Sequence, residues 1–201
     1  MKTEQITVSG TGAGIDEALA LTERVGSDAG LGKKPQLHLR LLAEELFGII
    51  RGIAGEVVAE YWIESEGSRF ELHLKSDVKL TEEMRDHFLA ASSSGKNSAA
   101  VSFMGKIRVM IADLLISAKE TLPYAMMNTV AAYPTGGTAG EVSSVWSLSI
   151  YRDEVRSRVG ESEEASEAWD ELEKSIVANI ADDIKVSIVG KKVEMILVKE
   201  F

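Results

Sequence analysis

The chain has 201 residues, with 22 basic and 32 acidic side chains and a formal net charge of −10 at pH 7. That length fits one domain with a sizeable buried core. The absence of cysteine excludes disulfides, thiolate metal sites and cysteine nucleophiles. A surface this acidic repels phosphate backbones, so we expect no nucleic-acid partner. No apolar run reaches the roughly 20 residues of a membrane helix, and the N-terminus lacks a signal-peptide pattern. We therefore expect a cytoplasmic protein without a membrane partner.

The N-terminal quarter of the chain predicts one strand followed by two helices. Residues 6–9 alternate apolar and small polar side chains, and the glycines after them indicate a turn rather than a dinucleotide motif. Asp16 is predicted to cap the first helix, which covers residues 17–25. Residues 37–55 then form the most apolar helix of the chain, with apolar side chains recurring at helical spacing. This helix must pack against a sheet or other helices, and Gly55 is predicted to end it.

Two hairpins are predicted in the remainder of the chain. Residues 57–63 and 70–74 form strands joined by a polar turn that contains Gly67. Apolar and polar side chains alternate strictly in the second of these strands, which predicts one buried face and one solvated face. Residues 184–198 form the second hairpin, with its turn at Gly190.

Helices fill the segments between the hairpins, and the order of elements predicts the fold class. One helix covers 101–116, and another begins at Ser162 or Ser166. Hairpins with helices gathered between them predict an α+β fold, in which helices cover one face of a mixed, largely antiparallel sheet as a two-layer sandwich. We expect one domain over 1–201, with an inserted loop and helix region at 119–180. The other face of the sheet is expected to be solvated or to face a partner.

The helix over 37–55 carries two adjacent carboxylates, Glu44 and Glu45, followed by Gly48. In its place in the element order, this helix resembles the motif helix of GHKL ATPase domains (the Bergerat fold), and most of all the anti-sigma-factor type of serine/threonine kinase. That family uses an E-x-x-x-N box, in which the glutamate orients or deprotonates the attacking group and the asparagine coordinates magnesium. The resemblance gives Glu44 the glutamate's catalytic role and places Gly48 where the asparagine belongs. A register that starts at Glu45 places Ile49 at the asparagine position instead. Neither Gly48 nor Ile49 has a side chain that binds a metal.

The two other nucleotide motifs of the family are degenerate in this chain. The resemblance matches Asp77 to the aspartate that receives the adenine amino group, but the D-x-G-x-G glycines are missing. The family's lid ends in paired glycines at a helix N-terminus that present N–H groups to phosphate. A segment of lid-like composition and one such glycine are present here. The resemblance therefore implies the following nucleotide-binding positions and no metal-binding side chain: Glu45, Gly48, Asp77, Ser94, Gly95, Lys96, Asn97 and Gly105.

Several of these residues also fit a purely structural role. Glu44 and Glu45 fit the solvent edge of a helix, and Gly48 fits close packing of a helix on a strand. Lys96 and Asn97 fit an ordinary exposed loop. The histidines share no spacing that indicates a metal site: His38, His73 and His87.

Three functions from different classes remain as hypotheses. The first is a GHKL-like regulatory protein that has lost catalysis and acts by binding a protein partner, with or without a nucleotide. The second is an active kinase or ATPase with Glu44 as general base and ATP with magnesium as its cofactors. The third is a structural protein that forms homodimers through the 119–180 region and an acidic segment within it. That segment contains Glu161, Glu163, Glu164, Glu167, Asp170, Glu171 and Glu173. Phosphoryl transfer relies on charge neutralisation by magnesium, so the missing asparagine favours the first hypothesis.

Overall fold

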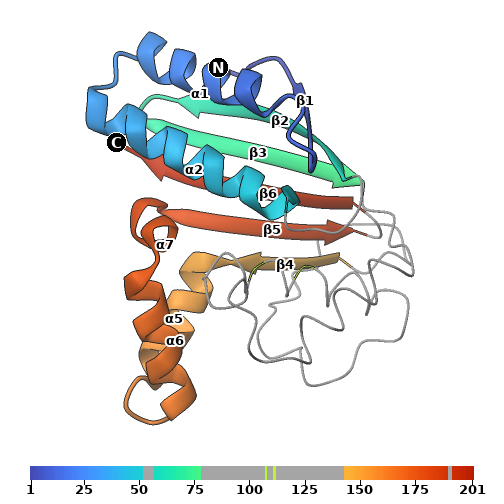
Figure 1. Cartoon of the computed structure of the whole chain (residues 1–201). Helices are drawn as coiled ribbons and strands as arrows, with labels where there is room; N and C mark the ends of the chain where they lie inside the picture. The colour runs from blue at the N-terminus through green and yellow to red at the C-terminus, as the bar shows by residue number, and fades with distance from the viewer. Residues whose placement is uncertain (52–56, 78–106, 108–110, 112–142, 190–191) are drawn as a thin grey trace.

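A computed structural model describes residues 1–51, 57–77, 107, 111, 143–189 and 192–201 (Figure 1). Within this part of the chain, six strands form one open sheet in the order β1-β2-β3-β6-β5-β4. The strands are β1 (Ile6–Ser9), β2 (Val58–Glu66), β3 (Arg69–Asp77), β4 (Ser143–Ser147), β5 (Asp183–Val189) and β6 (Lys192–Glu200). The helices are α1 (Ile15–Asp28), α2 (Lys33–Arg51), α5 (Leu148–Arg158), α6 (Glu163–Lys174) and α7 (Ile176–Ile180).

The sheet confirms the predicted α+β class and both predicted hairpins, β2–β3 and β5–β6. A mixed sheet was expected, but every pair of neighbouring strands in the described sheet is antiparallel. The connection between β1 and β2 explains part of this difference. It contains the two predicted helices, and two helices bring the chain back to run antiparallel to β1 instead of making the single-helix crossover that joins parallel strands.

Gly14 closes the turn between β1 and α1, at a position where only glycine fits. Its φ of 76° lies in the left-handed region, and an added Cβ would lie 2.0 Å from the backbone oxygen of Thr7. The Gly14 carbonyl accepts the first helical hydrogen bond, from the N–H of Ala18. Gly14 is therefore the N-cap of α1, and the prediction of Asp16 as the cap was wrong. Asp16 lies instead in the first turn, where the helix dipole stabilises its charge.

The helices α1 and α2 lie over one face of the sheet (Figure 1). The core side chains of β2 and β3 point toward these helices, and Phe47 of α2 meets the ring of Tyr61 edge-on with centroids 4.9 Å apart. Gly26 allows α1 to approach α2 closely. A Cβ at Gly26 would lie 3.2 Å from the side chain of Gln36 and 3.5 Å from that of Leu39. This face of the sheet is therefore covered by closely packed helices.

One buried polar contact joins α1 to the sheet. The hydroxyl of Thr22 donates its only hydrogen to the carbonyl of Ala18 at 2.8 Å. The hydroxyl of Tyr61 must then be the donor in its 2.7 Å contact with Thr22. Burial raises the pKa of Tyr61 well above its ordinary value, against a smaller lowering by the hydrogen bond with Thr22. The phenol therefore stays protonated and keeps its donor role.

The helices α5, α6 and α7 are grouped beside the β4 edge of the sheet (Figure 1). The carboxylate of Asp183 at the start of β5 accepts hydrogen bonds from the hydroxyl of Ser147 and the N–H of Ser149, both at 3.0 Å. Asp183 thereby caps α5 and joins it to the sheet. The side chain of Ser162 accepts from the N–H of Ala165 at 3.4 Å. This cap confirms Ser162 as one of the two predicted helix starts.

Candidate functional site

The predicted catalytic residue, Glu44, takes part in a surface ion-pair network. Its carboxylate pairs with Arg40 one turn earlier on α2, with Nε and Oε1 2.8 Å apart. Arg40 also pairs with Glu23 of α1, and the hydrogen bonds that Arg40 donates to Glu23 and then to Glu44 raise the pKa of Arg40. Glu44 and Glu45 are both exposed. One carboxylate oxygen of Glu44 is engaged by Arg40, so the local role of Glu44 is that of a helix-surface ion pair.

The space around Gly48 distinguishes it from the packing glycine of α1. A Cβ added to Gly48 would meet no described heavy atom within 4 Å, apart from its chain neighbours and its own helix backbone. Packing of the described elements therefore does not require glycine at this position. A glycine inside a helix costs roughly 1 kcal/mol relative to alanine. The described elements therefore give no support to the close-packing explanation of Gly48.

The other predicted nucleotide positions are not assembled into a site by the described contacts. Asp77 is exposed at the end of β3, where the sheet pairs it with Lys192 of β6. Within the described ranges, no hydrogen bond or ion pair joins Asp77 to Glu44 or Glu45. The remaining predicted positions lie outside the described residues: Ser94, Gly95, Lys96, Asn97 and Gly105.

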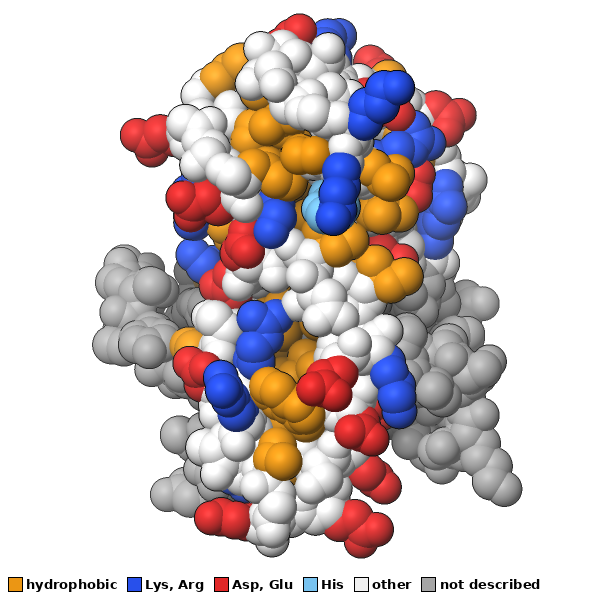
Figure 2. Space-filling view, turned by 90° about the vertical axis from the view of Figure 1, so that its left-hand side faces the viewer, with side chains coloured by type: hydrophobic (Ala, Val, Ile, Leu, Met, Phe, Trp, Pro, Cys, Tyr) orange, Lys and Arg blue, Asp and Glu red, His pale blue; other side chains and the backbone are white. Residues whose placement is uncertain are grey.

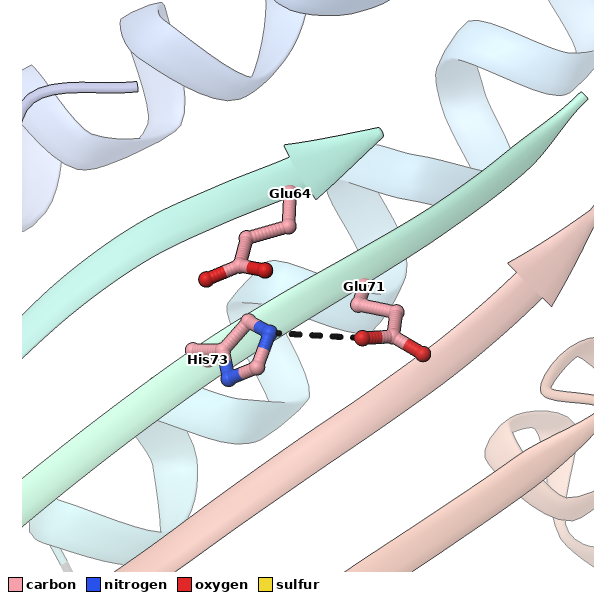
Figure 3. A group of neighbouring side chains, drawn as sticks. All are labelled: Glu64, Glu71 and His73. Atoms are coloured by element: carbon pink, nitrogen blue, oxygen red, sulfur yellow. Dashed lines mark ion pairs between the residues drawn. The ribbon is translucent and has the colours of Figure 1, made fainter. Parts of the chain in front are cut away.

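The opposite face of the sheet carries a compact group of ionisable side chains, here called the His73 cluster: Glu64, Glu71 and His73. Glu64 of β2 lies directly across from Glu71 of β3, and Trp62 lies across from His73. Figure 3 shows the two carboxylates and the imidazole turned toward one another on the two neighbouring strands. One potential ligand atom from each residue lies within 4.8 Å of those of the other two.

His73 is the unusual member of this cluster. The residue is only 6% exposed, and neither ring nitrogen has a hydrogen-bond partner. The nearest acceptors are Glu71 Oε2, 3.6 Å from Nε2, and Glu194 Oε1, 3.6 Å from Nδ1. The indole of Trp62 covers one side of the imidazole, with centroids 4.7 Å apart and planes 11° from parallel. Buried polar atoms are nearly always hydrogen-bonded, so an imidazole without such a partner is an exception that calls for an explanation.

In each carboxylate of the His73 cluster, one oxygen accepts hydrogen bonds from side chains that lie outside the cluster. Glu64 Oε1 accepts from Lys2 and from the indole N–H of Trp62, each at 2.9 Å. The bond from Lys2, followed by that from Trp62, lowers the pKa of Glu64. Glu71 Oε1 accepts from Arg69 at 2.6 Å, while its Oε2 is the oxygen nearest the imidazole. The donors orient both carboxylates, and the second oxygen of Glu71 faces the imidazole.

This cluster was not predicted from the sequence, because the three histidines share no spacing along the chain that indicates a metal site. The available signal was in the first predicted hairpin. Trp62 and Glu64 share one face of its first strand, and Glu71 and His73 share one face of its second. Pairing the two strands across the Gly67 turn brings these four residues together.

Comparisons with protein-family models, with curated proteins and with solved structures find no match for this chain. In the part of the chain that the structure describes, no helix combines the length and apolar character needed to cross a bilayer.

Proposed function

We propose that this chain is a regulatory protein of GHKL-like architecture that has no catalytic activity and acts by binding a protein partner. The observation that carries the proposal is Gly48. It stands where the resemblance requires a magnesium-binding asparagine, and no described atom outside its own helix and chain neighbours lies within 4 Å of an added Cβ. Because packing of the described elements does not account for the glycine, the proposal takes the loss of the metal ligand as its functional consequence. Phosphoryl transfer without a correctly held magnesium loses much of its charge stabilisation.

The surroundings of Glu44 support the same proposal. A general base must present a carboxylate oxygen to the proton that it removes, whereas Oε1 of Glu44 lies 2.8 Å from Nε of Arg40 in an ion pair. The link through Arg40 to Glu23 gives Glu44 a structural role between α2 and α1. Two features of α2 therefore point away from catalysis. Gly48 lacks a metal-binding side chain, and the carboxylate of Glu44 is paired with Arg40.

Exposed apolar side chains support partner binding. Leu37 near the start of α2 is 53% exposed, and Ile176 at the start of α7 is 65% exposed. Figure 2 looks at the side of the molecule that is on the left in Figure 1. It shows two groups of hydrophobic side chains, with basic and acidic residues around them. Apolar groups rimmed by polar residues are typical of protein–protein contacts.

Calorimetry on the full chain with ATP and ADP, each with and without magnesium, tests the loss of catalysis. We expect magnesium to leave the affinity for either nucleotide unchanged, and we expect no release of phosphate from ATP. The matched variant is Glu44→Gln, which removes the charge that a general base would need. Magnesium-dependent tightening, or phosphate release that Glu44→Gln abolishes, would show that the protein is an active enzyme.

The GHKL-like architecture has its own test, in which the missing ligand is put back. Gly48→Asn supplies the amide oxygen that the family pattern uses, and Gly48→Ala controls for the change in helix propensity. We expect the asparagine variant alone to gain magnesium-dependent ATP binding. Equal behaviour of the two variants in the same calorimetric titration would contradict the resemblance on which the proposal rests.

A further inference from the structure

We propose that Glu64, Glu71 and His73 form a binding site for one divalent transition-metal ion, and that Zn²⁺ fits it best. The site lies on the sheet face that α1 and α2 do not cover. It shares no residue with the predicted nucleotide positions and therefore does not depend on the proposed function.

The spacing of the ligand atoms fits a tetrahedral ion. Zinc bonds of about 2.0–2.2 Å to imidazole nitrogen and carboxylate oxygen place neighbouring ligand atoms roughly 3.3–3.6 Å apart. His73 Nε2 and Glu71 Oε2 are 3.6 Å apart and thus already have this separation. The third ligand atom, from Glu64, lies within 4.8 Å of the other two. A shift of about one ångström in the partly exposed Glu64 side chain completes three ligands, and water takes the fourth position.

The unpartnered imidazole is the second observation that points to an ion. Bound metal would use the Nε2 lone pair of His73 and leave a proton on Nδ1. That Nδ1–H faces Glu194 Oε1 of β6, 3.6 Å away. Histidines that bind metal ions usually donate their other ring N–H to a carboxylate or a carbonyl. One ion therefore accounts for both ring nitrogens that now lack a hydrogen bond.

The charged groups around the imidazole include three carboxylates and the cations that offset them. Lys2 and Arg69 pair with Glu64 and Glu71, and Lys75 lies across from Glu194 in the sheet. Two glutamates directly across from each other in a strand pair repel. Imidazole with two carboxylates suits zinc and its transition-metal neighbours, whereas an all-oxygen set suits calcium or magnesium.

A protonated imidazole is the main competing explanation. An imidazolium at His73 would donate from Nε2 toward Glu71 and from Nδ1 toward Glu194, and it would satisfy the same atoms without a metal. The two explanations differ in what excess metal does. A bound ion displaces the proton from Nε2, because only the neutral imidazole is a ligand.

The direct test titrates Co²⁺ into the chelator-treated full chain and follows its visible absorption, with Zn²⁺ added as competitor. We expect one equivalent with a four-coordinate spectrum, lost on adding one equivalent of Zn²⁺. Glu64→Gln and Glu71→Gln should each weaken the affinity by about tenfold or more. Glu60→Gln is the matched control, because Glu60 is an exposed carboxylate of β2 outside the cluster. It should bind like the unaltered chain.

A second measurement keeps the proposal testable if substitution of the buried His73 impairs folding. NMR of the His73 ring in the unaltered chain reports which nitrogen is protonated before and after Zn²⁺ is added. We expect a proton on Nδ1 alone in the zinc-bound protein. A ring that stays doubly protonated in excess Zn²⁺ would overturn the proposal. Metal affinity that Glu64→Gln and Glu71→Gln leave unchanged would overturn it as well.

Discussion

The two faces of the central sheet are built from the same strands but held in different ways. Along β3, Phe70, Leu72 and Leu74 point into the core under α1 and α2, while Glu71 and His73 point to the other face. The covered face is stabilised by burial of apolar surface, which depends on shape and volume. The opposite face carries charged side chains, and exposed ion pairs add little stability. We infer that packing of the covered face determines whether the protein folds, and that charged side chains of the opposite face serve ligand binding.

The largest expected effect comes from opening a cavity in the covered face. Leu72 is completely buried, so Leu72→Ala should lower the free energy of unfolding by about 2–5 kcal/mol. Glu71→Gln, one residue away on the other face, should cost less than about 1 kcal/mol because its pair with Arg69 is partly exposed. Urea unfolding measures both. Similar losses in the two variants would mean that the faces do not differ as described.

A smaller effect should follow from the buried hydroxyl pair in the covered face. Thr22→Val removes the acceptor for the Tyr61 hydroxyl and leaves a buried donor unpaired, which should cost about 1–3 kcal/mol. The double variant with Tyr61→Phe removes both partners and should recover part of this loss. A double-mutant cycle by urea unfolding measures the coupling. Additive losses would show that the hydroxyls do not interact.

The same tyrosine predicts how stability changes in alkali. The folded pKa of Tyr61 is raised above the unfolded value of about 10, so the fold favours the protonated phenol. This stabilisation is complete below pH about 10 and is lost as the pH rises from there through the folded pKa. Between pH about 9 and about 11, the urea midpoint of unfolding should therefore fall further for the unaltered chain than for Tyr61→Phe. Parallel declines would contradict a buried, protonated phenol.

The sequence predicted the elements whose signals are local. Alternation in β3, the apolar stripe of α2, the final hairpin and the serine cap of α6 were all visible, because each depends on a few neighbouring residues. The strand β4 was not predicted. Its sequence, Ser143–Ser147, is short and serine-rich, and it becomes a strand by pairing with β5 about 40 residues later along the chain. The helix α7 has five residues, too few to show a helical period.

The candidate site shows the same limit more sharply. The His73 cluster depends on the register of β2 against β3, and Glu194 reaches it only through the pairing of β3 with β6. Neither register can be read from one strand alone. Glu44, in contrast, has its ion-pair partner Arg40 four residues away, a spacing that can be read along the chain, although this pair was not predicted. A pair within one helix depends on spacing alone, whereas a pair across the sheet depends also on the strand register.

The smallest predicted effects compare two helical glycines, one in packed surroundings and one in open surroundings. At Gly26 an added methyl group would press on Gln36, whose side-chain amide is fixed by a 2.7 Å hydrogen bond to the carbonyl of Leu31. Gly26→Ala should therefore destabilise the protein by about 1 kcal/mol, despite the better helix propensity of alanine. Gly48→Ala should stabilise it by about 0.5–1 kcal/mol, since the methyl group meets no described atom outside the helix.

Thermal and urea unfolding of the two alanine variants should thus shift in opposite directions. Stabilisation by Gly48→Ala would mean that glycine is kept at this position despite a cost in stability, as expected where a metal-binding side chain has been lost. Destabilisation by Gly48→Ala would instead show that the glycine has a packing role, and the observation that carries the proposed function would fail. The sign of this one small change therefore matters more to the function of the protein than the much larger loss expected at Leu72.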